Sequence, residues 1–215
     1  MELYVFSKEV AVANEAQIIN NLFANGLEHL HLRKPETSKD ELADLLRQVE
    51  SAYYERIALH QFHDLAEELG IRRLHFTTAH RKLVGQHELL KYSDAGYTMS
   101  TSVHTWGEIK GLENFNALFY SPVFDSLSKP GYAGTLTNDF KLGENYIDRL
   151  IALGGISIDN IIQTKTMGFQ AAAVLGAIWN DPSTALKNFF DLKKHLQEYN
   201  SSHPRSVNTI LTKPY

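Results

Sequence analysis

The 215-residue chain contains no cysteine, which excludes disulfide bonds, thiolate metal ligands and a cysteine nucleophile. It has no block of basic residues, and a formal net charge of −4 gives no electrostatic reason to expect nucleic acid or an anionic membrane as a partner. No apolar run approaches the roughly 20 residues that a transmembrane helix needs, and the first residues lack a signal-peptide pattern. We therefore expect a cytoplasmic protein without nucleic-acid or membrane partners.

The composition is that of an ordinary globular protein, with 43% hydrophobic and 21% charged residues. Apolar periods of two and of 3.6 alternate from end to end, which predicts strands alternating with helices. The expected strands are 3–6, 28–32, 56–60, 73–76, 96–101, 117–121, 150–153 and 171–175. The expected helices are 14–23, 38–49, 65–69, 105–112, 158–165 and 182–199.

Eight short strands with interleaved helices favour a closed parallel barrel over an open doubly wound sheet. An open sheet would show a glycine-rich turn after its first strand, and residues 7–14 contain no glycine. We therefore predict an α/β fold, a single-domain (βα)8 TIM barrel over residues 1–199. Residues 200–215 form a polar tail that we expect to be mobile or docked on a neighbour.

Two apolar runs near the end of the predicted barrel finish in glycine, one at Gly154-Gly155 and one at Gly176. We expect a helix to start after each run, with free N–H groups and a positive dipole end that attract phosphate. (βα)8 barrels usually hold a phosphate after strands seven and eight. We predict phosphate binding by Gly154, Gly155, Gly176 and Ala177. Valine at position 155 or 176 should then remove ligand affinity and leave the fold intact.

Polar side chains gather at the expected C-terminal ends of the strands, where barrel active sites lie. They are Ser7, Lys8, His31, Arg33, Lys34, His60, Gln61, His75, Thr77, His80, Thr101, Ser102, His104, Ser126, Ser128 and Lys129. Most such histidines serve packing or a structural hydrogen bond, but several that converge on one barrel mouth favour a site. Arg33 and Lys129 are candidate anion partners, with a surface cation as the alternative for each.

His104 follows the fifth expected strand and precedes an expected helix. An imidazole at a barrel mouth can accept and release a proton near neutral pH. The alternative is a histidine that contacts backbone near a helix N-terminus. The residues alone leave both interpretations open.

Four short motifs occur in order: His31-Leu-Arg33, Ser121-Pro-Val-Phe-Asp-Ser-Leu-Ser-Lys129, Leu153-Gly-Gly-Ile156 and Val174-Leu-Gly-Ala-Ile178. They resemble the Gln-Leu-Arg, Gly-Pro-x-Phe-Pro-Thr-x-Thr-Lys, Ile-Gly-Gly-Ile and Val-x-Ser-Ala-Ile motifs of the thiamine phosphate synthase and thiazole tautomerase superfamily of (βα)8 barrels. The resemblance runs from about Met1 to Lys193. It implies an enzyme of thiamine biosynthesis whose partner is a small phosphorylated thiazole.

The chain departs from the synthases where they hold magnesium. The resemblance implies that synthases join an aminopyrimidine diphosphate to a thiazole phosphate, with magnesium on two aspartates; those positions read Gln61 and about His80 here. Magnesium prefers carboxylate oxygens, so both are poor replacements. The tautomerase branch resembles these barrels without the aspartates and with a Ser-x-His pattern, which is found at Ser102-Val-His104.

The resemblance therefore implies a metal-independent thiazole tautomerase without a cofactor, which aromatises a thiazole phosphate carboxylate by moving a proton. His104 would carry the proton, and the N–H groups of Gly155 and Gly176 would hold the phosphate. We infer that His31 and Arg33 meet the carboxylate. The other expected substrate-binding residues are His60, Ser102, Ser126, Ser128 and Lys129.

Two alternatives stay open. A diverged, magnesium-dependent thiamine phosphate synthase is favoured by Ser126, Ser128 and Lys129, which match diphosphate-binding positions. A histidine-ligated metal protein, or a non-catalytic sensor of a thiazole or pyrimidine phosphate, is favoured by four histidines that approach one mouth, since imidazole suits zinc. These histidines are His31, His60, His75 and His80. The sequence does not fix the oligomeric state, and a homodimer is one option.

Overall fold

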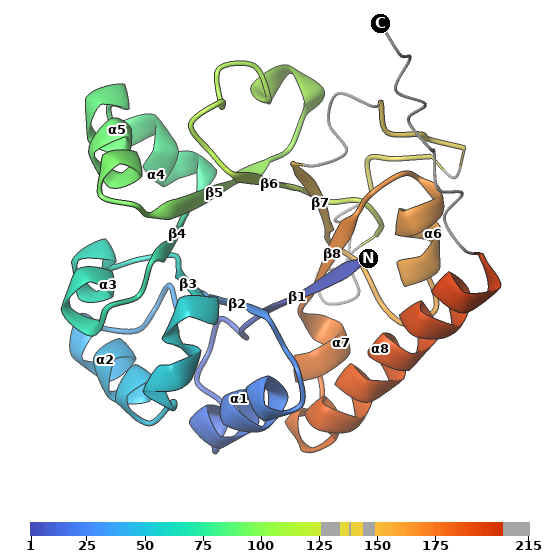
Figure 1. Cartoon of the computed structure of the whole chain (residues 1–215), viewed down its shortest axis with the longest axis horizontal. Helices are drawn as coiled ribbons and strands as arrows, with labels where there is room; N and C mark the ends of the chain where they lie inside the picture. Colours follow the sequence, from blue (N-terminus) through green and yellow to red (C-terminus); the bar gives the residue numbers. More distant parts are fainter. Residues whose placement is uncertain (126–133, 138, 144–148, 204–215) are drawn as a thin grey trace, which may run out of the picture.

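The computed structural model describes residues 1–125, 134–137, 139–143 and 149–203. Eight parallel strands pair in sequential order, and the eighth pairs with the first to close a barrel. The helices lie around the outside of this ring of strands (Figure 1). The fold is a single-domain (βα)8 barrel, which confirms the class predicted from the sequence.

The strands are β1 (Glu2–Phe6), β2 (His29–Leu32), β3 (Ile57–Leu59), β4 (Arg73–Phe76), β5 (Thr98–Val103), β6 (Ala117–Tyr120), β7 (Leu150–Leu153) and β8 (Ala171–Val174). Each overlaps the range predicted for it. The largest shift is at β5, which runs from Thr98 to Val103 where the apolar pattern predicts 96–101.

The helices are α1 (Glu15–Ala24), α2 (Lys39–Arg47), α3 (His63–Leu69), α4 (Thr78–Leu83), α5 (Gln86–Asp94), α6 (Ile161–Thr166), α7 (Gly176–Trp179) and α8 (Ala185–Ser202). Short 3₁₀ helices are η1 (Ser51–Arg56), η2 (Trp106–Glu108) and η4 (Pro182–Thr184). The sequence pattern predicts neither α4 nor α5, because α4 buries no side chain and α5 buries only Leu89. It overestimates the helix at 105–112, which is reduced to η2. None of the described helices is long and apolar enough to cross a membrane.

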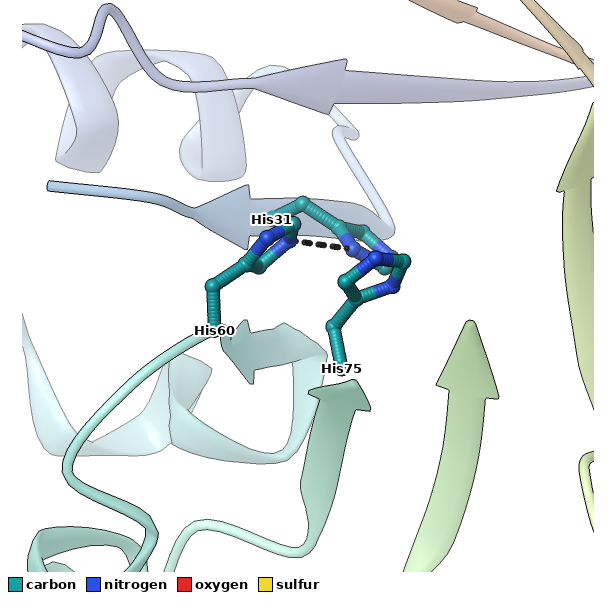
Figure 2. A group of neighbouring side chains, drawn as sticks. All are labelled: His31, His60 and His75. Carbon is teal, nitrogen blue, oxygen red and sulfur yellow. Dashed lines mark hydrogen bonds between the residues drawn. The ribbon is translucent and has the colours of Figure 1, made fainter. Parts of the chain in front are cut away.

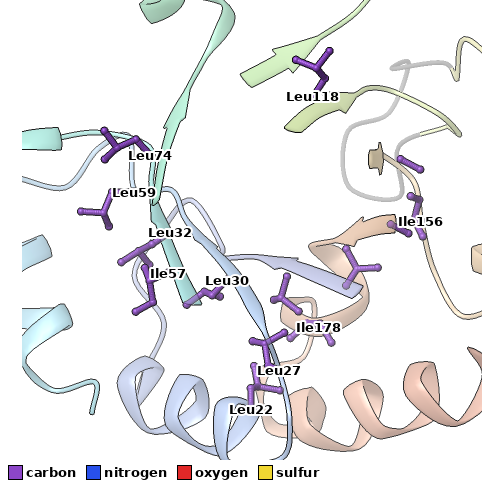
Figure 3. Close-up of a cluster of buried hydrophobic side chains, with 14 of the residues drawn as sticks. Leu22, Leu27, Leu30, Leu32, Ile57, Leu59, Leu74, Leu118, Ile156 and Ile178 are labelled. Carbon is purple, nitrogen blue, oxygen red and sulfur yellow. The ribbon is translucent and has the colours of Figure 1, made fainter. Parts of the chain in front are cut away.

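Alternation along the strands produces two buried layers. In β2, Leu30 and Leu32 point outward and join a core between the strands and the surrounding helices (Figure 3). Burial of each such leucine contributes about 1.5–3 kcal/mol. His29 and His31 point into the barrel, where they pack with Tyr4 and Phe6 of the neighbouring strand. The barrel interior is therefore partly polar, while the outer core is apolar.

The small apolar cluster inside the barrel lies mainly on the side of β6 to β8. Its buried members are Phe6, Phe119, Ile151, Ala171 and Ala173. The side of β2 to β5 carries imidazoles and hydroxyls instead, from histidines on β2 and β4 and serines on β5. The packing of the interior thus places the polar groups together, on four adjacent strands.

Gly154 and Gly155 follow β7 with φ angles of 96° and 66°, a left-handed region that favours glycine. A Cβ atom on Gly155 would overlap the backbone carbonyl oxygen of Asp125 in the segment after β6. Helix α6 begins only at Ile161, so no helix N-terminus lies at this turn. The prediction that valine at position 155 leaves the fold intact is therefore wrong, because a side chain there collides with the chain itself.

Replacement of Gly155 by alanine should destabilise the protein by at least about 2 kcal/mol, because left-handed backbone strain of about 1–3 kcal/mol adds to the collision. For a chain of this length that lowers Tm by about 4–8 °C. Gly107→Ala is the matched control, since a Cβ at Gly107 has no neighbouring atom within 4 Å. Calorimetric Tm values of the two variants check this, and equal values would contradict the assignment.

Candidate functional site

The parallel strands bring the predicted site residues to one end of the barrel, which we call the C-terminal mouth. His31 is the penultimate residue of β2, His60 follows β3, Ser102 is the penultimate residue of β5, His104 follows β5, and Gly176 lies two residues beyond β8. Arg33, Gly154, Gly155 and Ala177 lie one to three residues beyond their strands. The predicted residues Ser126, Ser128 and Lys129 lie outside the described residues.

Three imidazoles meet inside the mouth, and we call His31, His60 and His75 the histidine group (Figure 2). One ring nitrogen from each lies within 4.8 Å of the others. Nδ1 of His31 and Nε2 of His60 form a hydrogen bond of 3.0 Å, and the rings of His60 and His75 stack with centroids 4.0 Å apart. His31 and His75 lie in β2 and β4, and His60 directly follows β3 between them, so the pairing of these strands brings the three side chains together.

Apolar rings and hydroxyls surround the histidine group. Phe6 stacks on His31 with ring centroids 4.6 Å apart, and Phe119 meets the same imidazole edge-on. Nδ1 of His75 is 3.0 Å from Oγ of Ser100, and its Nε2 is 3.0 Å from Oγ of Ser102. The predicted substrate ligand Ser102 therefore also fixes the ring of His75.

Burial keeps the three imidazoles neutral. His31 and His60 are 4% and 5% exposed, and His75 is fully buried. Loss of hydration lowers the pKa of His75 to about 3, with His63 and Arg33 as further causes, and it lowers the pKa values of His31 and His60 well below the usual range. Nδ1 of His60 is buried without a hydrogen-bond partner among the described residues, which costs about 1–3 kcal/mol.

His80 does not belong to this group. It lies on α4, where its ring packs against Phe76 and against His63 of α3, with centroids 5.2 Å and 5.0 Å away. Nε2 of His63 lies 3.2 Å from the backbone oxygen of His75 and therefore donates to it. These two histidines pack outside the strands, in the layer of helices.

Gln61 ties together the ends of β2 and β3. Its side-chain oxygen accepts the N–H of Lys34 at 3.1 Å, and its side-chain nitrogen donates to the carbonyl of the same residue. Both ends of the amide are thus used by the backbone of one residue. Neither Gln61 nor His80 fits magnesium, because the first is engaged and neutral and the second offers nitrogen to an ion that prefers carboxylate oxygens.

Lys34 is a structural cation and not an open anion ligand. Its side chain is 2% exposed, and Nζ lies 2.7 Å from a carboxylate oxygen of Glu15 and 2.8 Å from the carbonyl of Val10. This buried pair joins the end of β2 to the start of α1. Arg33, the neighbouring cation, is half-buried and pairs with the carboxylate of Glu9, so a substrate carboxylate would have to compete with Glu9.

Lys34→Met should destabilise the protein by about 3–5 kcal/mol, because the carboxylate of Glu15 then stays buried without its cation. The double variant with Glu15→Leu should recover most of that loss. Lys39→Met is the control, since its pair with Asp64 is exposed and such pairs contribute about 0–1 kcal/mol. Urea unfolding measures all three, and a double variant no more stable than Lys34→Met would refute this reading of the pair.

The ring of His104 is oriented by the segment after β6. Its Nδ1 lies 2.8 Å from the carbonyl oxygen of Ser121. A carbonyl can only accept a hydrogen bond, so Nδ1 carries the hydrogen and the neutral ring has its lone pair on Nε2. His104 is only partly buried. Of the described histidines at the mouth, it is thus the one that combines a fixed tautomer with access from outside.

Two residues that the sequence pattern does not single out hold the segment of His104. Nη1 of Arg81 donates to the carbonyl of Ser102 at 2.9 Å, and its Nη2 lies 3.5 Å from the carboxylate of Glu108. That carboxylate accepts the backbone N–H of His104 at 3.2 Å. Arg81 lies on the unpredicted helix α4, so no sequence signal places it here.

The turn after β8 is followed by a helix, as predicted, but this helix is short. Gly176 and Ala177 begin α7, where helix geometry leaves the first N–H groups without partners in the helix. α7 is one turn long, so its dipole is small. A Cβ atom on Gly176 would lie 3.2 Å from the side-chain amide of Asn180, which can move. Phosphate binding at this turn stays a prediction.

Stability should fall in acid because buried histidines are neutral in the fold. Burial, with His80 as a second cause, lowers the pKa of His63 to about 4, and unfolding returns it to about 6.5. The unfolded chain then binds more protons between these values, so this contribution is complete above about pH 6.5 and lost as the pH falls toward 4.

His63→Gln should flatten the pH dependence of unfolding free energy by on the order of 2 kcal/mol between about pH 7 and pH 4. Glutamine can keep the bond to the His75 carbonyl but does not titrate. The control is His87→Gln, at an exposed position of α5. Urea unfolding at several pH values checks this, and an unchanged slope in His63→Gln would show that another group dominates.

Comparison with known proteins agrees with this architecture. A model of the thiamine monophosphate synthase family matches residues 3–178. A thiamine phosphate pyrophosphorylase from Bacteroides thetaiotaomicron superposes with a TM-score of 0.70 and 27% identity, over 92% of this chain and 98% of that one. None of the curated proteins matches the chain.

More distant structures share the fold alone. A thiamine phosphate pyrophosphorylase from Pyrococcus furiosus has a TM-score of 0.68 and 17% identity, over 92% of this chain and 96% of that one. Phosphoribosyl anthranilate isomerase from Thermus thermophilus has a TM-score of 0.57 and 11% identity, over 93% of this chain and 100% of that one.

Proposed function

The chain belongs to the thiamine monophosphate synthase family, and from this premise we propose that it is a thiazole tautomerase of thiamine biosynthesis. The substrate would be a thiazole phosphate carboxylate, and the reaction a proton transfer that makes the ring aromatic. The observation that carries this proposal is the orientation of His104, whose Nδ1–H donates to the carbonyl of Ser121.

His104 has the properties of a general acid–base group. With its hydrogen on Nδ1, the neutral ring offers the lone pair of Nε2 to a proton of the substrate. The imidazolium formed would return that proton to another position of the substrate. The substrate and His104 therefore gain or lose no atom or electron overall. The bond to Ser121 holds the same ring orientation in both protonation states, because Nδ1 keeps its hydrogen throughout.

The remaining predicted residues would bind the two anionic groups of the substrate. The N–H groups of Gly176 and Ala177, at the start of α7, would bind the phosphate. Arg33 would donate hydrogen bonds to the substrate carboxylate after releasing the carboxylate of Glu9. His31 and His60 are too deeply buried to contact the thiazole substrate with more than the edge of a ring.

A thiamine phosphate synthase activity is the second candidate. It is favoured by the 27% identity to a protein described as a thiamine phosphate pyrophosphorylase. That reaction must neutralise a departing diphosphate. Gln61 and His80 stand where the family resemblance places the magnesium aspartates, and the first is engaged with Lys34 while the second packs on Phe76. We therefore rank the tautomerase first.

His104→Asn should lower kcat for isomerisation of the thiazole phosphate carboxylate by about 10²–10⁴-fold, the usual contribution of a general acid–base group. Asparagine can still donate to Ser121, so product binding should change little. Spectroscopic assay of aromatisation and calorimetric binding of the product measure the two effects. His87→Asn, at an exposed site on α5, is the control with unchanged kcat.

Two results would overturn this proposal. Full isomerase activity in His104→Asn would show that His104 is not the proton carrier. If the wild-type protein has no isomerase activity and forms thiamine phosphate at ordinary enzyme rates, the synthase becomes the supported function.

A further inference from the structure

The histidine group has features that acid–base chemistry at His104 does not use. His31, His60 and His75 come from three adjacent strands and converge, with one ring nitrogen from each within 4.8 Å of the others (Figure 2). In the described part of the chain, no carboxylate or other ionisable ligand belongs to this group. All of its donors are therefore imidazole nitrogens.

These separations are close to those of a metal site. Zn–N bonds of about 2.0–2.1 Å with tetrahedral angles place ligand nitrogens about 3.3 Å apart. The nitrogens of His31 and His60 are already 3.0 Å apart. The ring of His75 stacks on that of His60 with an interplanar angle of 20°, so its side chain would have to rotate to direct a nitrogen to the same point.

The surroundings of the group supply the second requirement of a metal site. A ligating histidine usually uses its other ring nitrogen to bond a neighbouring group. Nδ1 and Nε2 of His75 have the hydroxyls of Ser100 and Ser102 beside them, and one of these hydroxyls could serve as that neighbouring group. In contrast, Nδ1 of His60 is buried without a partner among the described residues, so this ring, whose Nε2 faces His31, lacks such an outer bond.

We propose that His31, His60 and His75 bind one divalent transition-metal ion of the zinc class within the C-terminal mouth. Imidazole suits zinc, cobalt, nickel and copper, and it disfavours magnesium. Three protein ligands leave a fourth position open, as in catalytic zinc sites. Ser102, which bonds His75, is a partly exposed neighbour of the group near the end of β5, and we place the open position on this side.

The charge of the site determines what fills the fourth position. Three neutral imidazoles leave a bound divalent ion with two positive charges in a buried location. An anionic ligand, either hydroxide or an anionic group of a small molecule, offsets part of that charge. This site is independent of the proposed proton transfer, and it departs from the expectation that the chain holds no metal.

The test uses the full chain without a histidine tag. The protein is stripped with EDTA, titrated calorimetrically with zinc chloride, and passed through gel filtration before its metal content is measured by mass spectrometry. We expect one zinc ion per chain to be retained, and no binding of magnesium chloride under the same conditions. Cobalt(II) should give the intense visible absorption of a tetrahedral site rather than the weak one of an octahedral ion.

Variants assign the site. His60→Asn and His75→Asn should each weaken zinc binding by more than about 100-fold, beyond the 10–100-fold effect of outer partners. His63→Asn and His87→Asn, which remove histidines outside the group, should retain one zinc ion. The wild-type stoichiometry and the cobalt spectrum do not depend on whether the ligand variants fold.

Three results would overturn the site: less than stoichiometric zinc after gel filtration, an octahedral cobalt spectrum, or unchanged affinity in both ligand variants. None of these measurements uses turnover. Failure of the metal site and failure of the proposed tautomerase are therefore separate outcomes.

Discussion

The closed barrel imposes one constraint on which the rest of the molecule depends: alternate residues of every strand point into an interior with little water. This chain places His29, His31 and His75 at such positions, and His60 just beyond a third strand. Loss of hydration is the largest cause that keeps these rings neutral, even at His29, where the carboxylate of Glu2 lies 3.7 Å away. Neutral rings can stack, share hydrogen bonds and offer lone pairs, which is what the mouth of this barrel provides.

The same constraint separates two kinds of chemistry. Below the mouth, the histidine group is held by Phe6, Phe119 and serines of β5. His104 directly follows β5 and is only partly buried. Its ring is oriented by the hydrogen bond to Ser121 instead of by burial. A fixed tautomer with access from outside suits proton exchange, whereas converging buried nitrogens suit an ion. Strand periodicity thus gives neighbouring histidines different environments.

The strands and the site's location follow from sequence because apolar runs and strand ends are local features. The contacts between His31, His60 and His75 are not local, since they depend on the register of three strands. His80 illustrates this limit: α4 begins at Thr78, so the ring turns toward His63 and away from the mouth. For Gly155 the sequence shows the glycine but not the close approach of the Asp125 carbonyl, which leaves no room for a side chain.

The central claim is that this mouth lacks the magnesium carboxylates of the synthases, since Gln61 and His80 stand at their positions, and we therefore propose proton transfer in place of displacement of diphosphate. Parallel assays of the wild-type protein test it most directly. One follows aromatisation of the thiazole phosphate carboxylate without magnesium, and the other follows thiamine phosphate formation from aminopyrimidine diphosphate and thiazole phosphate with magnesium. We predict turnover in the first assay alone. Magnesium-dependent thiamine phosphate formation at ordinary enzyme rates would contradict the account.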